Sequence, residues 1–385
     1  VIIVGLAMGT TVTIGHSVGA KCMEQAEKII GNTITLFMGI AVAFTVILVV
    51  LVKPIVVLIA TPQEAVAGTS IYLLICFIGI PFITAYNIIS SIFRGLGDSK
   101  SPMYFIGIAC VMNIALDYLF MGAFHMGAAG AALGTVCAQT FSVLVTLWVI
   151  RRRKTGISLK KSDFKIERAV IGQVLKIGIP VALQDGFIQV AFMIITVIAN
   201  SRGVSDAAAV GVVEKVISAL FIVPSSMLAT VSALSAQNLG AGKEKRATDT
   251  LRYATVITTI YGMIVAVLIQ FIAENVVGIF TSDTTVVTMG SAYIRSYIWD
   301  CIFAGIHFSF SGYFAACGKS YIGFLHNIIS ITFVRVPGSY LASKYFTDTL
   351  YPMGLAAPAG SLVSVAICVT AFILLKRKSR VAQTA

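Results

Sequence analysis

The chain has 385 residues, of which 58% are hydrophobic and only 11% are charged. Soluble domains carry about 25% charged residues, and a chain of this size cannot hide so much apolar surface from water. The composition therefore predicts a protein whose natural solvent is lipid.

Apolar runs of about 20 residues, long enough to cross a bilayer as helices, recur along the whole chain. The alternating pattern of a membrane β-barrel is absent from the sequence, so we predict an all-α polytopic membrane protein. Eleven spans are expected at residues 1–18, 31–52, 69–93, 101–122, 127–150, 173–200, 207–237, 250–272, 289–316, 321–342 and 352–375.

The second half of the chain repeats the first at an offset of about 221 residues. Gly19-Ala20 then falls on Gly240-Ala241, and Phe93 falls on Phe314. Two six-helix copies of the same direction predict two lobes related by a pseudo-two-fold axis along the membrane normal. The second copy is longer before its Gly-Ala pair, so we expect a twelve-helix parent whose first helix precedes Val1.

The hydrophilic segment 151–172 separates the two copies. We therefore predict an N-terminal lobe at 1–150 (helices 2–6 of twelve), a cytoplasmic linker at 151–172, and a C-terminal lobe at 173–385 with a basic tail. The net charge is +12, and the basic residues are unevenly distributed across the predicted membrane, since 22 of the 28 Lys and Arg residues fall on one side. This positive-inside pattern predicts a cytoplasmic C-terminus, and it argues against a nucleic-acid partner. The expected location is the bacterial inner (plasma) membrane.

No catalytic constellation is evident in the sequence. Residues 15–19 read GHSVG, which matches the G-x-S-x-G string of a nucleophile elbow, but the string ends a membrane helix and its repeat copy reads AQNLG. The seven cysteines have no metal-type spacing. We therefore predict no enzyme, no cofactor and no structural metal.

The sharpest signal is a polar pair deep in the predicted span 101–122. Asn113 and Asp117 are four residues apart, so they share one helix face. An ionised carboxylate is costly in lipid and must be buried among polar groups, bind a cation or take up a proton. These oxygens, with a hydroxyl from another helix, predict a site for H⁺ or Na⁺; a purely structural buried aspartate is the alternative.

A second set of polar residues lies in the spans of the C-terminal lobe. Asp300 and His307 are seven residues apart and share a face. Each member of the set is as consistent with structural pairing as with lining a substrate cavity. The candidate cavity residues are Gln184, Asp185, Gln189, Glu214, Asp300 and His307.

Several segments together resemble the multidrug and toxic compound extrusion (MATE) transporters. They are QNLGAGKEKRA at 237–247, KIGIPVALQ at 176–184, FRGLGDSKSPM at 93–103, and NIALDYLF at 113–120 followed by MGAAGAALGTVCAQ at 126–139. The chain is most similar to the DinF-like branch, whose cation site implies roles for Asn113, Asp117 and Thr135. That branch also uses an Asp on helix 1, for which this sequence offers no match. The acidic residues that form the site of another MATE branch align with Ile188 and Gly305 here, so the site of that branch is not expected in this chain.

The resemblance implies a secondary transporter that exports organic cations or amphipathic compounds by H⁺ or Na⁺ antiport with alternating access. Its implied partners are the bilayer and small drug-like substrates, and we expect a monomer. One alternative is a lipid-linked saccharide flippase of the same superfamily, against which the scarcity of basic residues in the spans argues. An intramembrane enzyme lacks its catalytic residues here, and a non-transporting scaffold would not need Asn113 and Asp117 deep in the membrane.

Overall fold

The computed structural model describes residues 2–58, 62–152 and 159–384, and every regular element in that part of the chain is helical. It contains two compact units, Gly9–Leu175 and Val1–Met8 with Lys176–Ala385. Val1 and residues 153–158 of the predicted linker lie outside the described residues, as do the side chains of the predicted tail beyond Arg377.

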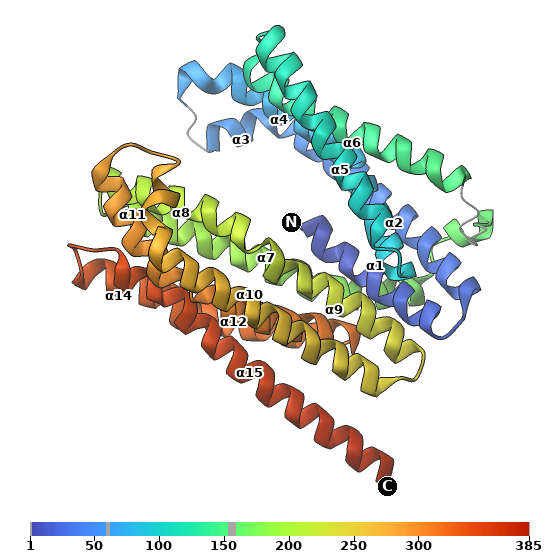
Figure 1. The fold of residues 1–385 in the computed structure, drawn as a ribbon. Coiled ribbons are helices and arrows are strands. Elements are labelled where there is room, and N and C mark those ends of the chain that lie inside the picture. The colour runs from blue at the N-terminus through green and yellow to red at the C-terminus, as the bar shows by residue number, and fades with distance from the viewer. Residues whose placement is uncertain (1, 59–61, 153–158, 385) are drawn as a thin grey trace. The chain divides into compact units, whose positions relative to one another are not determined.

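In the first unit, drawn from blue to green in Figure 1, α4 packs against both α2 and α6, and α6 packs against α5. A short π-helical segment, η1, follows α5 directly. The elements are α1 (Ile2–Gly19, from Gly9 onward), α2 (Met23–Val50), α3 (Val52–Leu58), α4 (Gln63–Leu96), α5 (Lys100–Asp117), η1 (Tyr118–Ala123), α6 (Gly127–Arg152) and the 3₁₀ turn η2 (Lys161–Phe164).

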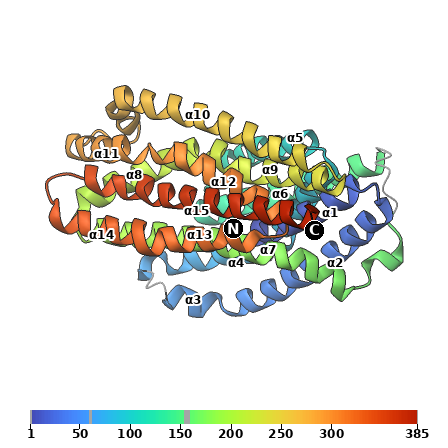
Figure 2. The same cartoon turned by 90° about the horizontal axis from the view of Figure 1, so that it is seen from below.

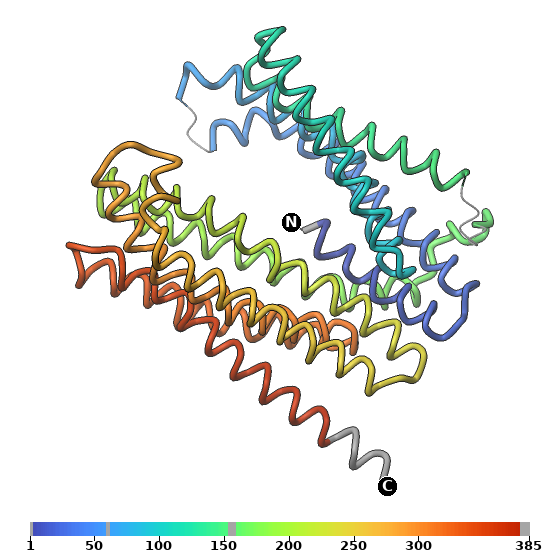
Figure 3. Tube along the Cα trace, viewed as in Figure 1, coloured from blue at the N-terminus to red at the C-terminus, as the bar shows by residue number. Residues whose placement is uncertain are grey.

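In the second unit α12 is the central helix, in contact with α9, α10, α13 and α15. Figure 2 shows α13 and α14 following each other in one line, joined by the π-helical segment η3, and the trace in Figure 3 follows α10 as one uninterrupted rod. The elements are α7 (Arg168–Asn200), α8 (Val204–Leu220), α9 (Ile222–Gly240), α10 (Glu244–Gly278), α11 (Thr284–Tyr297), α12 (Asp300–Ala316), α13 (Ser320–Ser330), η3 (Ile331–Arg335), α14 (Val336–Tyr345) and α15 (Tyr351–Thr384).

Eight helical segments in the described part of the chain are long and apolar enough to cross a membrane. The other three predicted spans coincide with α1, with the α11–α12 pair and with the α13–η3–α14 series, which are short or interrupted. The multi-pass helical architecture is therefore confirmed, whereas the number of eleven spans stays a prediction.

Prolines inside the spans occupy two kinds of position. Pro81, Pro180 and Pro358 lie within continuous helices. Pro224 and Pro337 lie in the first turn of α9 and of α14, just after a helix break and after η3. A proline cannot donate to the carbonyl four residues earlier, which leaves that oxygen without its helical partner in a membrane.

For three of these prolines, a hydroxyl from a neighbouring helix donates to the released carbonyl, so the kink leaves no unpaired oxygen there. We call these contacts proline latches. They run from Thr45 to the Phe77 carbonyl before Pro81 (3.1 Å), from Ser320 to the Lys176 carbonyl before Pro180 (3.3 Å), and from Tyr261 to the Leu220 carbonyl before Pro224 (2.9 Å).

The described part of the predicted linker is packed onto α2 and is not a free loop. The Asn32 side chain donates to the Asp163 carbonyl at 3.1 Å and accepts from the Glu167 amide at 2.7 Å. Gly31 leaves no room for a Cβ against the backbone of Asp163. Asn32 therefore fastens the segment that leads into α7, although this segment reads as hydrophilic and exposed.

Candidate functional site

The polar pair predicted in the first unit lies at the end of α5. The Asn113 amide donates to Oδ1 of Asp117 at 3.3 Å, and both side chains are partly buried. Asp117 is the last residue of α5, directly before the π-helical segment η1. π-Helical turns widen the backbone and are frequent at functional sites.

The neighbouring helix α6 presents a glycine to this carboxylate. A Cβ added at Gly134 would collide with Oδ1 of Asp117 and would lie 3.5 Å from the Asn113 amide nitrogen. Glycine at this position therefore leaves the space that the carboxylate occupies.

Thr135, expected to complete the site, follows Gly134 in the chain, but its hydroxyl donates to the Ala131 carbonyl of its own helix at 3.1 Å. The structure thus brings Asn113, Asp117 and the α6 backbone together. It does not aim the Thr135 hydroxyl at the carboxylate.

In the second unit, Asp300 is the first residue of α12, next to the break that separates α12 from α11. Asp300 is 1% exposed and shares a cavity wall with Ser361 of α15, while Oδ1 has no hydrogen-bond partner among the described residues. The start of a helix favours a carboxylate because its amide groups carry partial positive charge.

Arg335, at the end of η3, supplies a cation to the same region. Its guanidinium donates to the Tyr297 hydroxyl and lies 5.0 Å from the ring centroid of Phe192 and 5.5 Å from that of Tyr297. Cation–π contacts of this kind stabilise a guanidinium away from water. Gly360 makes the approach of α15 possible, since a Cβ there would lie 2.9 Å from the Ser330 hydroxyl oxygen and 3.3 Å from Cβ of Arg335.

Two histidines extend this polar region along α12 and α13. The rings of His307 and His326 are 5% and 0% exposed, and their centroids are 5.4 Å apart. Nε2 of His326 is 2.9 Å from the Ser311 hydroxyl oxygen, and Nδ1 of each ring has no hydrogen-bond partner in the described chain. Asp300, His307 and Arg335 line one small cavity of about 50 Å³. We call Asp300, His307, His326 and Arg335 the buried polar cluster.

The six candidate cavity residues predicted from the sequence do not form one site. Asp300 and His307 share the cavity, and Gln184 is buried near Gly323 and Ser311. Glu214 is partly buried and accepts a hydrogen bond from Thr196 at 3.3 Å. Asp185 and Gln189 do not line the cavity, and the Gln189 side chain is exposed.

The six candidate residues predicted from the sequence did not include Arg335, His326, Tyr297 or Ser361, which the structure brings to this site. These residues come from η3, α13, α11 and α15, which are distant in sequence from one another. The sequence did contain one indication, because a basic residue in an apolar span must lie near an acidic side chain or the face of an aromatic ring. The sequence could not show which one, because no acid lies within one helical turn of Arg335.

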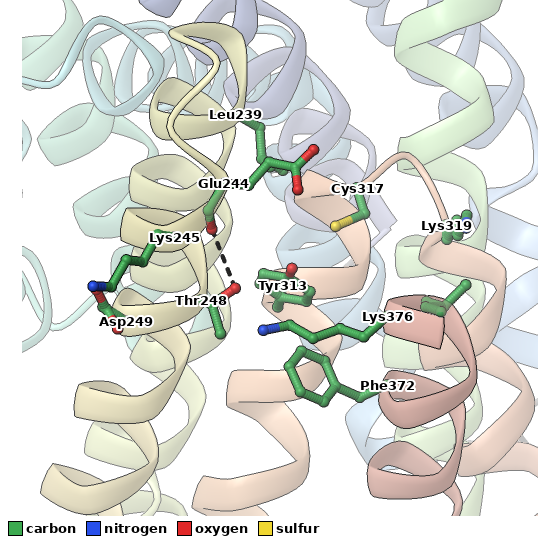
Figure 4. Close-up of a pocket in the computed structure, with 11 residues that line it drawn as sticks. Leu239, Glu244, Lys245, Thr248, Asp249, Tyr313, Cys317, Lys319, Phe372 and Lys376 are labelled. Atoms are coloured by element: carbon green, nitrogen blue, oxygen red, sulfur yellow. Dashed lines mark hydrogen bonds between the residues drawn. The ribbon is translucent and has the colours of Figure 1, made fainter. Parts of the chain in front are cut away.

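Figure 4 shows a different, open pocket of about 470 Å³ at the other end of α12. Lys376 extends beside Tyr313, with its ammonium nitrogen 5.2 Å from the ring centroid of Phe372. Three lysines and two acids line this pocket, so its charges largely balance. Tyr313 is 13 residues beyond Asp300 along α12, about 20 Å at helical rise, which separates the pocket from the buried polar cluster.

Comparison with known proteins identifies the family. The MatE family model matches residues 1–119 and 180–341. The chain belongs to the MatE family. It is 30% identical over 354 residues to the probable multidrug resistance protein YpnP of Bacillus subtilis (strain 168), covering 92% of this chain and 79% of that protein.

Other relatives agree with this assignment. The probable multidrug resistance protein NorM of Thermotoga maritima is 23% identical over 355 residues, which cover 90% of this chain and 75% of that protein. A solved structure described as the outward-facing conformation of a multidrug resistance MATE family transporter matches with a TM-score of 0.92 at 19% identity, covering 100% of this chain and 85% of that one. This member of the MatE family is therefore a multi-pass membrane transporter and not an enzyme.

Proposed function

We propose that this protein exports organic cations or amphipathic drug-like compounds across the bacterial plasma membrane, driven by inward movement of H⁺ or Na⁺. The relatives named as multidrug resistance and export proteins support the substrate class. The observation that carries the coupling step is the carboxylate of Asp117, which lies against Gly134 with the Asn113 amide as its described hydrogen-bond partner.

An acid without a cationic partner fits the binding of a coupling cation. In the described part of the chain the ion pairs are Arg202 with Asp206 and Arg295 with Glu274, so Asp117 takes part in none. A carboxylate embedded in apolar helices is stabilised by taking up H⁺ or by coordinating Na⁺. The amide oxygen of Asn113 offers a second hard-oxygen ligand for Na⁺ after rotation of the side chain.

Coupling requires that the cation bind the two transport states with different affinities. We propose alternating access in which Asp117 takes up its cation in the outward-facing state and thereby weakens substrate binding. The positive-inside pattern supports a cytoplasmic C-terminus. The expected twelve-helix parent, the monomeric state and the role of Thr135 stay predictions.

The test is ethidium export from everted membrane vesicles that carry the complete protein, energised by an imposed pH or Na⁺ gradient. We expect Asp117→Asn to reduce gradient-driven export at least about tenfold, since the amide can neither take up a proton nor balance a cation. Asp348→Asn is the matched control, because it makes the same change on an exposed side chain.

Two results would contradict the proposal. Export by Asp117→Asn at the rate of the unaltered protein would remove Asp117 from the coupling step. Absence of gradient-dependent ethidium export by the unaltered protein, with the protein present in the vesicles, would remove the assignment as an organic-cation exporter.

A further inference from the structure

A ladder of polar side chains runs along one face of α12 in the second unit. Asp300, His307 and Ser311 are separated by seven and four residues, spacings that return to the same side of a helix. At helical rise the ladder is about 17 Å long. It begins at the start of α12 and ends five residues before the last residue of that helix, Ala316.

Each of the two histidines has one buried ring nitrogen without a hydrogen-bond partner in the described chain. His326 faces the Ser311 hydroxyl through Nε2, at 2.9 Å, while its Nδ1 has no partner in the described chain. His307, whose ring centroid lies 5.4 Å from that of His326, also has an unpartnered Nδ1. A buried ring nitrogen without a hydrogen bond is costly, so these atoms call for a proton donor or acceptor such as water.

The cavity beside Asp300 has room for such water. Its volume of about 50 Å³ exceeds the roughly 10–15 Å³ that one water molecule needs. Asp300, Asn327, Ser330, Ser361 and Ser364 offer polar atoms on its walls. Water there would join the Asp300 carboxylate to His307.

We propose that His307 and His326 form a proton relay between the Asp300 cavity and the Ser311 end of α12, so that H⁺ is a coupling ion of this protein. This inference rests on the proposed export function for the direction of transport. It adds a second ion pathway, in the other unit from Asp117.

Each step of the relay is a proton transfer between neutral or singly charged groups. His326 accepts a proton at Nδ1 and releases one from Nε2 to the Ser311 oxygen, whose own hydrogen passes to the next water. His307 accepts a proton from water in the Asp300 cavity at one ring nitrogen and releases one from the other, through a bridging water, to Nδ1 of His326. Only N–H and O–H bonds form and break, and no oxidant or reductant is needed.

The groups that face the histidine pair set the charge of the path. Arg335 of η3 acts electrostatically on His307, and Tyr297 of α11 and Asp300 of α12 line the same cavity as His307. Glu214 of α8 and Cys301 of α12 interact with Tyr297 and Asp300 and not directly with the histidines. Toward the same region α15 presents Ser361 and Ser364, and α7 presents Ile188 and Phe192. Arg335 is thus the fixed cation near the histidine pair. Because it repels the positive charge of a protonated histidine, a proton occupies the relay only briefly and is not held there.

Na⁺ cannot use this path, because a relay moves protons between nitrogen and oxygen atoms without moving an ion through the helix. The experiment therefore compares His307→Gln and His326→Gln with the unaltered protein in proteoliposomes. Ethidium transport is driven by a pH gradient in one set and by a Na⁺ gradient in the other, and internal pH is followed with a trapped dye.

We expect each variant to lose at least about tenfold in pH-driven transport and in drug-induced proton movement, a modest part of what a positioned proton-transfer group contributes. Ethidium binding, measured by fluorescence polarisation, should change less than about twofold, because glutamine keeps the size and polarity of the side chain. His125→Gln is the matched control, since that histidine is exposed in the turn before α6.

The relay is overturned if both variants keep the pH-driven rate and the pH profile of the unaltered protein. It is also overturned if they lose ethidium binding in proportion to transport, since that indicates a structural role. Failure of the export function gives a different pattern, in which the unaltered protein moves neither ethidium nor protons under either gradient.

Discussion

The same helix of the repeat carries opposite charges in the two units. The 221-residue offset places α5 of the first unit on the α13–η3–α14 series of the second, and Ile114 on Arg335. Both contain a π-helical segment, η1 and η3, yet α5 ends in the carboxylate of Asp117, whereas η3 ends in the guanidinium of Arg335. The offset places η1 on residues 339–344 of α14 and not on η3, so the two widened turns lie at different positions of the shared scaffold. The charged residue next to each turn also differs.

The two regions also differ in burial. Asp117 is partly buried and has one described side-chain partner, Asn113, while Asp300 is 1% exposed and shares its surroundings with Arg335, Tyr297 and Ser361. A carboxylate with its own nearby cation is already partly balanced. One without such a cation has more to gain from an external H⁺ or Na⁺.

The largest expected effect comes from removing the fixed cation of the second unit. Arg335→Met removes the cation whose charge acts on the buried Asp300 carboxylate, although the two groups form no direct ion pair among the described residues, and we expect this loss to cost about 3 kcal/mol. That loss corresponds to a decrease of about 6–12 °C in the apparent melting temperature of the detergent-solubilised protein. Asp117→Leu in the first unit should cost less than about 1 kcal/mol, because no buried cation is left behind.

A double variant separates the charge effect from a packing effect. Arg335→Met together with Asp300→Leu removes both charges, so most of the lost thermal stability should return. If the double variant melts as low as Arg335→Met, then Arg335 acts through its contacts with Phe192 and Tyr297, and the contrast between the two units is not electrostatic.

The same contrast shows what the sequence can reveal. The membrane class and the helical fold follow from composition and apolar runs, because lipid allows few other solutions. Asn113 and Asp117 are one turn apart on a single helix, so their contact follows from helical spacing alone. The buried polar cluster draws on α12, α13 and η3, and its contacts with α11 and α15 depend on close helix approaches at positions such as Gly360. Helical spacing contains no information on such approaches.

A second prediction targets the space beside Asp117. Gly134→Ala places a methyl group where Oδ1 of Asp117 lies, so the carboxylate must rotate away from α6. We expect gradient-driven ethidium export to decrease at least about tenfold, with a loss of stability of about 1 kcal/mol or less because the displaced group is a flexible side chain. Gly107→Ala on α5 is the control, since a Cβ at Gly107 has no atom within 4 Å. Equal export by the two variants would show that Asp117 does not need its present orientation.

A third prediction concerns the linker segment, whose described part lies in the first unit and is hydrogen-bonded to Asn32 of α2. Asn32→Ala removes the bonds to the Asp163 carbonyl and the Glu167 amide, each contributing about 1 kcal/mol. We expect faster tryptic cleavage at Lys160, Lys161 and Lys165, by roughly tenfold, as the segment opens more often. Asn87→Ala is matched to it, because the Asn87 amide donates to a carbonyl of its own helix. An unchanged cleavage rate would mean that the packing of Asp163 holds the segment without Asn32.

The smallest effect is expected at the proline latches, which occur in both units. Tyr261→Phe removes the hydroxyl that donates to the Leu220 carbonyl and leaves that oxygen unpaired before Pro224. We expect a loss of about 1 kcal/mol, seen as a decrease of about 2–4 °C in apparent melting temperature. Tyr253→Phe makes the same change on an exposed tyrosine of the same helix and should have no effect.

In the first unit, Thr45→Val removes the corresponding bond to the Phe77 carbonyl, and Thr45→Ser should restore it. If Tyr261→Phe and Thr45→Val both melt with the unaltered protein, water or a shifted backbone satisfies these carbonyls, and the latches do not hold the kinks in either unit.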